Sequence, residues 1–212
     1  MTEYIIPYQD AESEFTEKRS RFITHLYQVE TEAEARTRIE EMKKKYYDAR
    51  HNCWCYLLRE GGVVRYSDDG EPQGTAGMPI LDVLQKNGLT DVCCVVTRYF
   101  GGVLLGANGL VRAYSHSTAL AIEAAQIKIM MPCYPVSIQT DYALYGKIAY
   151  HLPQEDILQL DTIFEDQVEL KLLVRDTLWD KLKQELIDLT SGQVEIVSGG
   201  LQYADFSKAK RL

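Results

Sequence analysis

The sequence lacks any excess of positive charge. Its 212 residues include 23 lysines and arginines against 31 aspartates and glutamates, which gives a formal net charge of −8. Proteins that coat nucleic acid by bulk electrostatics use Lys and Arg to displace the counterions of the phosphate backbone. That class is excluded here, DNA binding is not expected, and any anion-binding site must be a local feature of the surface.

Long apolar runs are also missing. One of the longest is VCCVV, residues 92–96, whereas a helix that crosses a membrane needs about 20 apolar residues. The N-terminal stretch MTEYIIPYQD has no basic segment followed by an apolar one, so it does not resemble a secretion signal. We therefore expect a cytoplasmic protein that does not act at a membrane.

Several sequence signatures of metal sites and catalysis are absent. The five cysteines include no C-x-x-C pair, and their odd number argues against a disulfide framework. The sequence has no G-x-x-x-x-G-K-[ST] motif, no strict G-x-G-x-x-G motif and no G-x-S-x-G nucleophile elbow. The pattern predicts reduced, structural cysteines, no cofactor and no metal site, and it favours a noncatalytic role over an enzymatic one.

The first part of the sequence contains a mixture of strand and helix patterns. A polar lead-in is followed by predicted strands and helices with clear end signals, such as a Thr31 cap and a Gly61–Gly62 hairpin turn. The strand at 90–99 is apolar on both faces, which is typical of a central strand. The predicted strands are 20–29, 52–60, 63–67 and 90–99, and the predicted helices are 31–46, 79–88 and 108–126.

A proline-containing segment, MMPCYP at 130–135, is predicted to break the chain into domains 1–131 and 132–212. The second part has the element order βαββαβ of a ferredoxin-like domain. Its predicted strands are 134–141, 161–166, 168–174 and 193–199, and its helices are 143–152 and 177–192. The fold class is therefore α+β with two domains.

Glycines are concentrated in RYFGGVLLGANGLVRAY, residues 98–114, between a buried strand and the start of a helix for which Asn108 is the predicted cap. Unpaired backbone N–H groups gather at such a junction and can form a concave anion-binding site. Arg98 and Arg112 flank the loop, and the planar fork of arginine holds phosphate or carboxylate in two places. The first loop therefore predicts a phosphate site.

A second glycine-rich loop, YSDDGEPQGTAGMP at 66–79, carries acids where the first carries bases. These acids can coordinate Mg²⁺, pair with the arginines or cap turns, and we favour capping or pairing. For both loops the alternative is that the glycines only permit close packing and the arginines only neutralise carboxylates. The candidate binding residues are Arg98, Gly101, Gly102, Gly106, Asn108, Gly109, Arg112, His51, Asp68, Asp69, Glu71, Gly74 and Thr75.

Three segments together resemble the IMPACT/YigZ family: DARHNCWCY (48–56), YSDDGEPQGTAGMPIL (66–81) and VVTRYFGGVLLGANGLVRAY (95–114). The resemblance covers the whole chain. It implies an N-terminal domain of the ribosomal-protein type, with a βαβ fold like domain IV of elongation factor G, and a C-terminal ferredoxin-like domain. Where many members have a lysine and a glycine in the third segment, this sequence has Leu104 and Asn108, which removes one positive charge from the predicted site.

By that resemblance the leading expectation is contact with RNA or the ribosome and modulation of translation. Eukaryotic relatives block the activation of a starvation-sensing kinase, a link that depends on an additional domain and is not expected of a two-domain protein of bacterial type. The first alternative is an enzyme or sensor that binds a phosphorylated small molecule or nucleotide at the glycine-rich loop. The second is a protein-binding module that uses the sheet around Trp54 and Tyr56.

Overall fold

The computed structural model describes residues 2–152 and 156–207. The contacts of the chain divide it between Lys128 and Ile129 into two units, of which the first runs from Tyr4 to Lys128. Nearly all of the second unit follows Ile129. Both units combine a sheet with helices, so the predicted α+β fold with two domains is confirmed.

The first unit has a five-stranded sheet in the order β2-β3-β6-β4-β5, in which every neighbouring pair is antiparallel. Strand β6 is central and buried along almost its whole length, as its apolar pattern predicted. A short strand, β1 (Tyr4–Pro7), precedes the sheet. The sheet strands are β2 (Ala11–Glu17), β3 (Ser20–Gln28), β4 (His51–Leu58), β5 (Val63–Ser67) and β6 (Val92–Tyr99).

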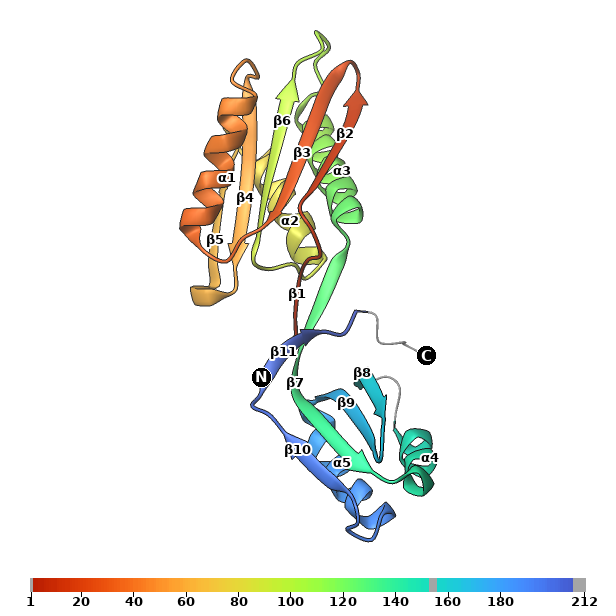
Figure 1. Ribbon diagram of the computed structural model, residues 1–212. Coiled ribbons are helices and arrows are strands. Elements are labelled where there is room, and N and C mark those ends of the chain that lie inside the picture. Colours follow the sequence, from red (N-terminus) through yellow and green to blue (C-terminus); the bar gives the residue numbers. More distant parts are fainter. Residues whose placement is uncertain (1, 153–155, 208–212) are drawn as a thin grey trace. The chain divides into compact units, whose positions relative to one another are not determined.

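Helices cover both faces of this sheet (Figure 1). Helix α1 (Glu32–Lys45) packs on one face over a core that includes Tyr56 and Val95. Helices α2 (Gly77–Lys86) and α3 (Ala107–Ala125) pack on the other face. Alternate residues of a strand point to opposite faces, so the all-apolar sequence of β6 supplies both cores at once.

Local residues explain where α1 begins and where the chain turns between β4 and β5. Thr31 caps α1, because its hydroxyl accepts a hydrogen bond from the Glu34 amide. Gly61 and Gly62, which have φ of +70° and +59°, lie in the short 3₁₀ turn Glu60–Gly62 that joins β4 and β5. These two predictions from sequence are confirmed.

Two predictions for this unit are corrected by the structure. The polar lead-in before residue 20, for which no strand or helix was predicted, contains β1 and β2. Strand β2 is polar because it is an edge strand of the sheet, and only alternate side chains such as Phe15 turn toward the core, where Phe15 stacks on Phe22 at 5.0 Å. Helix α3 begins at Ala107, and its N-terminal cap is Gly106 rather than Asn108.

The second unit is built around β7 (Ile127–Thr140), whose first two residues belong to the first unit. Strands β10, β7, β9 and β8 lie side by side in that order, all antiparallel, and β11 pairs with the first half of β7. The other elements are α4 (Tyr142–His151), β8 (Ile157–Phe164), β9 (Val168–Arg175), α5 (Asp176–Leu189), β10 (Glu195–Ser198) and β11 (Gln202–Asp205).

The order βαββαβ predicted for this unit is present from β7 to β10, and both helices pack on one hydrophobic core. The prolines at 130–135 do not interrupt the secondary structure, because β7 runs through this segment. The domain bounds 1–131 and 132–212 stay a prediction. Each proline has φ near −65°, which an extended strand accommodates, and it removes only one backbone N–H donor from the hydrogen bonds between strands. Strand β11, which was not predicted, pairs with this part of β7 from Met130 to Cys133.

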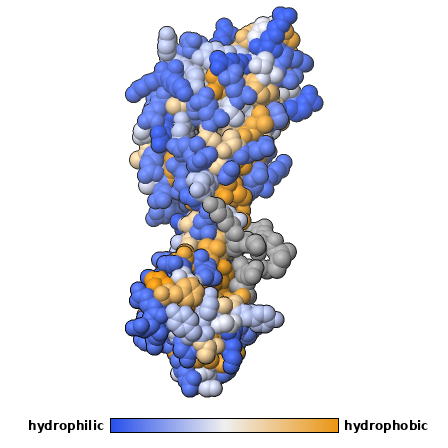
Figure 2. Space-filling view, turned by 45° about the vertical axis from the view of Figure 1, so that its right-hand side comes forward, coloured by the Kyte–Doolittle hydropathy of each residue, from blue (hydrophilic) through white to orange (hydrophobic). Residues whose placement is uncertain are grey.

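None of the helices in the described residues is long and apolar enough to span a membrane. On the face of the molecule shown in Figure 2, hydrophilic residues cover most of the first unit, with apolar patches between them. All five cysteines are buried and unpaired. Burial raises the pKa of the Cys53, Cys55 and Cys93 thiols far above the usual range, so these side chains stay protonated and unreactive.

One buried histidine makes the stability of the first unit depend on pH. His25 is only 5% exposed, its Nε2 lies 2.9 Å from the Tyr46 hydroxyl, and its ring stacks on Tyr27. Burial lowers the pKa of His25 below its usual value, and the nearby Glu12 carboxylate only partly opposes this effect while Lys45 adds to it. The unfolded chain therefore takes up a proton on this ring at a higher pH than the folded chain does.

We expect the free energy of unfolding of this unit to fall as the pH is lowered from about 7 to about 5.5, because the unfolded state binds more protons in that window. His25→Gln keeps a polar group beside Tyr46 but removes the titration, so its stability should vary less with pH. Urea unfolding followed by circular dichroism at several pH values measures the difference. Equal slopes for the two proteins would contradict this assignment.

Candidate functional site

A cavity of about 450 Å³ lies where the three characteristic segments of the sequence meet. Arg50 and the first residue of β4, His51, line one part of it. The acidic loop contributes Gly70, Glu71 and Pro72, and the end of β6 and the residue after it contribute Arg98 and Phe100. The remaining lining residues come from the glycine-rich loop and the first turn of α3: Leu104, Leu105, Gly106, Ala107 and Leu110. Antiparallel pairing of β4 and β6 places His51 opposite Arg98 and so joins two of these segments.

The N-terminus of α3 borders this cavity, because both Gly106 and Ala107 line it. Gly106 adopts φ +71°, which non-glycine residues rarely do, and no side chain caps the helix. The first amides of a helix have no partner within the helix and carry the positive end of its dipole. The cavity therefore offers backbone donors to an anion.

The exposed side of the cavity combines one cation with apolar groups. Arg50 is exposed, and Phe100 and Leu104 are 45% and 83% exposed. Arg50 immediately precedes β4, in a segment that the resemblance had marked, yet sequence reasoning did not select it. At Leu104, where the resemblance leads us to expect a lysine, the cavity has an apolar edge instead.

Arg98 is not the open phosphate ligand that the sequence predicted. Its side chain is 6% exposed, and Nη1 donates to Glu71 Oε1 at 2.7 Å, where the Glu71 side chain is 3% exposed. Nη2 donates to the Ser20 hydroxyl at 3.3 Å. The guanidinium also lies 5.6 Å from the ring centroids of both Phe22 and Phe100. The charge is neutralised inside the protein because strand β6 carries Arg98 into the interior.

The Arg98–Glu71 ion pair belongs to a larger buried network. Tyr114 of α3 donates its hydroxyl to Glu71 Oε1 at 2.8 Å. Burial raises the pKa of Tyr114 well above its usual value, so the hydroxyl remains a donor. Cys53 Sγ lies 3.3 Å from that hydroxyl. The network ties the acidic loop to β6 and to α3, which fixes the inner wall of the cavity.

Arg112 lies elsewhere. It lines a second cavity of about 270 Å³ together with Lys18, Gly109 and His116. Each residue of an α-helix turns the side chain by about 100°, so Arg112 is roughly 200° around α3 from Leu110, which faces the first cavity. The predicted pair of arginines on one anion is therefore not formed, because Arg98 and Arg112 point to different cavities.

The acidic loop serves as a set of turn and helix caps. The Asp68 carboxylate accepts hydrogen bonds from the amides of Gly74, Ala76 and Gly77 at 2.8, 3.0 and 2.8 Å. The last two amides lie at the start of α2, where a negative charge also complements the helix dipole. The Thr75 hydroxyl donates to the Pro72 carbonyl at 2.6 Å. These contacts agree with the capping interpretation rather than with a metal loop.

The other two carboxylates of the loop are also occupied by protein donors. Asp69 Oδ2 accepts from the Asn52 amide at 2.7 Å, and Oδ1 lies 3.5 Å from Lys43 Nζ. The Asp69 carbonyl lies 3.0 Å from His51 Nδ1, which orients the histidine ring at the cavity. Within residues 2–152 and 156–207, no cluster of His, Cys, Asp and Glu has the arrangement of a metal site.

Two structural constraints explain why glycines occur in the first loop. A Cβ on Gly101 would lie 2.0 Å from the backbone of Arg19, so only glycine fits where the loop crosses the β2–β3 turn. Gly102, like Gly106, has a positive φ, here +82°. Gly109 lines the second cavity, and Asn108 is exposed in the first turn of α3. Close packing and loop conformation therefore both contribute to the glycine content.

The fold and this cavity define a class: two-domain α+β proteins in which a glycine-rich loop and a helix N-terminus border a cavity of the first domain. Residues 18–122 match the model of the Impact N-terminal domain, and residues 138–193 match a domain of unknown function (DUF1949). The chain belongs to the IMPACT family.

Individual relatives agree with this assignment. The chain is 36% identical to the IMPACT family member YvyE of Bacillus subtilis, over 95% of this chain and 94% of that protein. It is 30% identical to the IMPACT family member YigZ of Escherichia coli, over 85% of this chain and 90% of that protein. A crystal structure described as that of an hypothetical protein superimposes with a TM-score of 0.59 at 28% identity, covering 94% of this chain and 98% of that one.

Proposed function

We propose that this protein binds structured RNA or the ribosome in the cytoplasm and modulates translation without catalysing a reaction. The observation that carries the proposal is the 450 Å³ cavity, where the uncapped N-terminus of α3 lies beside Arg50 and Phe100. Helix amides and an arginine bind phosphate, and an exposed aromatic ring stacks on a base. The role in translation rests on the resemblance of the sequence to its family.

The placement of charges supports a local contact with RNA. The net charge of −8 repels a polyanion, so binding depends on the few cations that face outward. Arg50 fulfils this role at the first cavity, and Arg112 fulfils it at the second, on the other side of the first turns of α3. We assign phosphate contacts to these two arginines and to the α3 amides, and a positioning role to Arg98.

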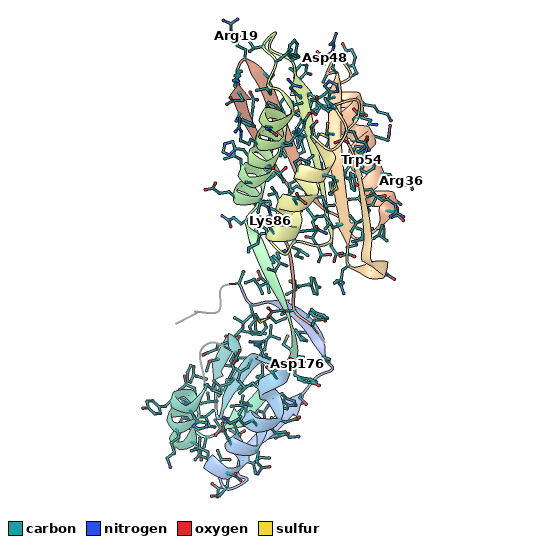
Figure 3. All side chains as sticks on the ribbon, turned by 180° about the vertical axis from the view of Figure 1, so that it is seen from behind. Arg19, Arg36, Asp48, Trp54, Lys86 and Asp176 are labelled. Carbon is teal, nitrogen blue, oxygen red and sulfur yellow. The ribbon has the colours of Figure 1, made fainter. Side chains whose placement is uncertain are left out.

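The test is RNA binding as a function of salt concentration. Each lost phosphate contact reduces the slope of log K against log salt by about 0.7–0.9. Arg50→Ala and Arg112→Ala should each lower the affinity and flatten the slope, and Phe100→Ala should lower the affinity with little change in slope. Lys86→Ala is the matched control, because Lys86 is exposed at the end of α2 and lines neither cavity (Figure 3). Unchanged slopes for both arginine variants would refute the assignment.

A phosphorylated small molecule is the second candidate, and the size of the cavity favours it. Cavities that hold small ligands typically measure about 300–1,000 Å³. Calorimetry with a panel of nucleotides, in the presence and absence of Mg²⁺, distinguishes the two candidates. Saturable heat from a mononucleotide that Arg50→Ala abolishes would favour the small molecule, whereas binding only of RNA would favour the proposed function.

A further inference from the structure

A third cavity, of about 430 Å³, lies between α1 and the edge strand β5. We call it the α1–β5 groove, and its lining residues are Arg36, Ile39, Glu40, Lys43, Trp54, Tyr56 and Arg65. We propose that this groove holds an unpaired base of single-stranded RNA, stacked on Trp54, with the neighbouring phosphates near Arg36 and Arg65. The choice of RNA rests on the proposed function, but the site and its residues are separate from those described above.

A stacked pair of aromatic rings lines the groove. The rings of Trp54 and Tyr56 are nearly parallel, at 10°, with centroids 5.6 Å apart. Tyr56 is 2% exposed and donates its hydroxyl to Glu32 Oε2 at 2.7 Å, so it is fixed in place. Trp54 lines the groove and is only partly buried. A planar ring placed over Trp54 would extend the stack, as bases do on the aromatic platforms of proteins that bind single strands.

Three cationic side chains line the groove: Arg36, Lys43 and Arg65. Carboxylates partly balance them, because Glu40 also lines the groove, Lys43 lies 3.5 Å from Asp69, and Arg36 lies 3.8 Å from Glu32. Arg36 is 73% exposed, so its ion pair is weak. Arg65 is exposed, and its Nη1 donates to the carbonyl of its neighbour Val64. These two exposed guanidinium groups suit an anionic ligand.

Topology explains why the groove stays open. Helix α1 packs over β4 and β6, while β5 lies at the end of the sheet order, beyond the helix. Arg65 is paired opposite Tyr56 in the sheet, and Arg36 reaches the same place from α1. Figure 3 shows Arg36 and Trp54 next to each other at this side of the unit. The groove therefore lies beside the edge strand β5.

The groove is separate from the first cavity. Trp54 and His51 are both in β4 but three residues apart, and alternate residues of a strand point to opposite faces of the sheet. Helix α1 lines the groove, whereas the first turn of α3 lines the first cavity. The groove is therefore a second site, whose binding can be tested independently of the cavity.

Trp54 provides a direct readout of this site. The chain has two tryptophans, and Trp179 lies in the core of the other unit, so the full-length Trp179→Phe protein reports on Trp54 alone. We expect saturable quenching of Trp54 fluorescence by a single-stranded RNA hexamer. Arg36→Ala together with Arg65→Ala should weaken this binding roughly tenfold, as expected for lost phosphate contacts and a less ordered stack. Arg38→Ala is the control, because Arg38 is on the same helix but contacts Tyr27 and Asp10 outside the groove.

The outcomes separate this proposal from the proposed function. Absence of quenching, or quenching that the double variant leaves unchanged, would overturn the groove as an RNA site even if Arg50→Ala weakens overall RNA binding. Equal quenching by an acidic peptide would also overturn it and would identify a protein partner instead. Quenching that depends on Arg36 and Arg65, with no effect of Arg50 or Arg112 on affinity, would support the groove and refute the cavity as the site of RNA binding.

Discussion

Replacement of Arg98 by methionine is expected to lower the free energy of unfolding of the first unit by about 3–5 kcal/mol. The reason is that Glu71 would be left buried without its counterion. Its side chain is 3% exposed, and within the described residues the Tyr114 hydroxyl is the donor that its carboxylate would keep. A charge buried without its counterion costs far more than the net contribution of an intact pair. Urea unfolding followed by Trp54 fluorescence in the Trp179→Phe protein measures this unit specifically.

The double variant Arg98→Met with Glu71→Gln tests the origin of that loss. It removes both charges and keeps an acceptor for Tyr114, so we expect it to recover most of the stability. The exposed ion pair of Arg21 with Glu14, 2.6 Å long but with side chains 52% and 42% exposed, provides the comparison. Arg21→Met should leave the stability nearly unchanged, because the pair is exposed to solvent. A double variant as unstable as Arg98→Met alone would show that the pair does not act as a unit.

The network around Arg98 also gives that residue a role in the proposed site. It connects β6 to the acidic loop and, through Tyr114, to α3, which are the elements that enclose the cavity. A fixed wall lets the α3 amides face a ligand without a loss of conformational entropy on binding. The charge that faces outward comes from Arg50 instead. The electropositive character predicted for this loop therefore depends on residues of a different segment.

The sequence predicted most of the fold because its signals are local. The apolar pattern of β6, the Thr31 cap and the Gly61–Gly62 turn each determine a structure within a few residues. Strand β2 was missed because its polar, solvent-facing residues conceal the alternation of Ala11, Ser13 and Phe15, which turn inward. The prolines near 132 were interpreted as a break, although β7 tolerates them.

The candidate site was only partly predictable, because ion pairs depend on contacts between distant parts of the chain. The resemblance marked the three segments, and the sequence suggested that Glu71 or its neighbours pair with an arginine. It did not show that β6, apolar on both faces, carries Arg98 into the interior, where only a carboxylate can accompany it. Nor did it distinguish Arg50 from other surface arginines, since its position at the cavity follows from β4 pairing beside β6.

Replacement of Asp68 by alanine is expected to lower the free energy of unfolding of the first unit by about 2–4 kcal/mol. Three amides, those of Gly74, Ala76 and Gly77, would lose a charged acceptor in a partly buried loop. Asp68→Asn should have a smaller effect, because its single carbonyl oxygen can still accept from part of this set. Asp82→Ala, an exposed carboxylate of α2, should change the stability by less than about 0.5 kcal/mol.

The same variants decide between a capping and a metal-binding loop. A carboxylate whose two oxygens accept three amide donors has little capacity left for a cation, so Mg²⁺ should leave the melting temperature of the wild-type protein unchanged. If Asp68 were a metal ligand, Mg²⁺ would instead stabilise the wild-type protein by mass action and would lose this effect in Asp68→Asn. Thermal unfolding with and without Mg²⁺ distinguishes the two. A metal-dependent increase that Asp68→Asn abolishes would overturn the capping role and restore phosphate chemistry assisted by Mg²⁺ as a function of this cavity.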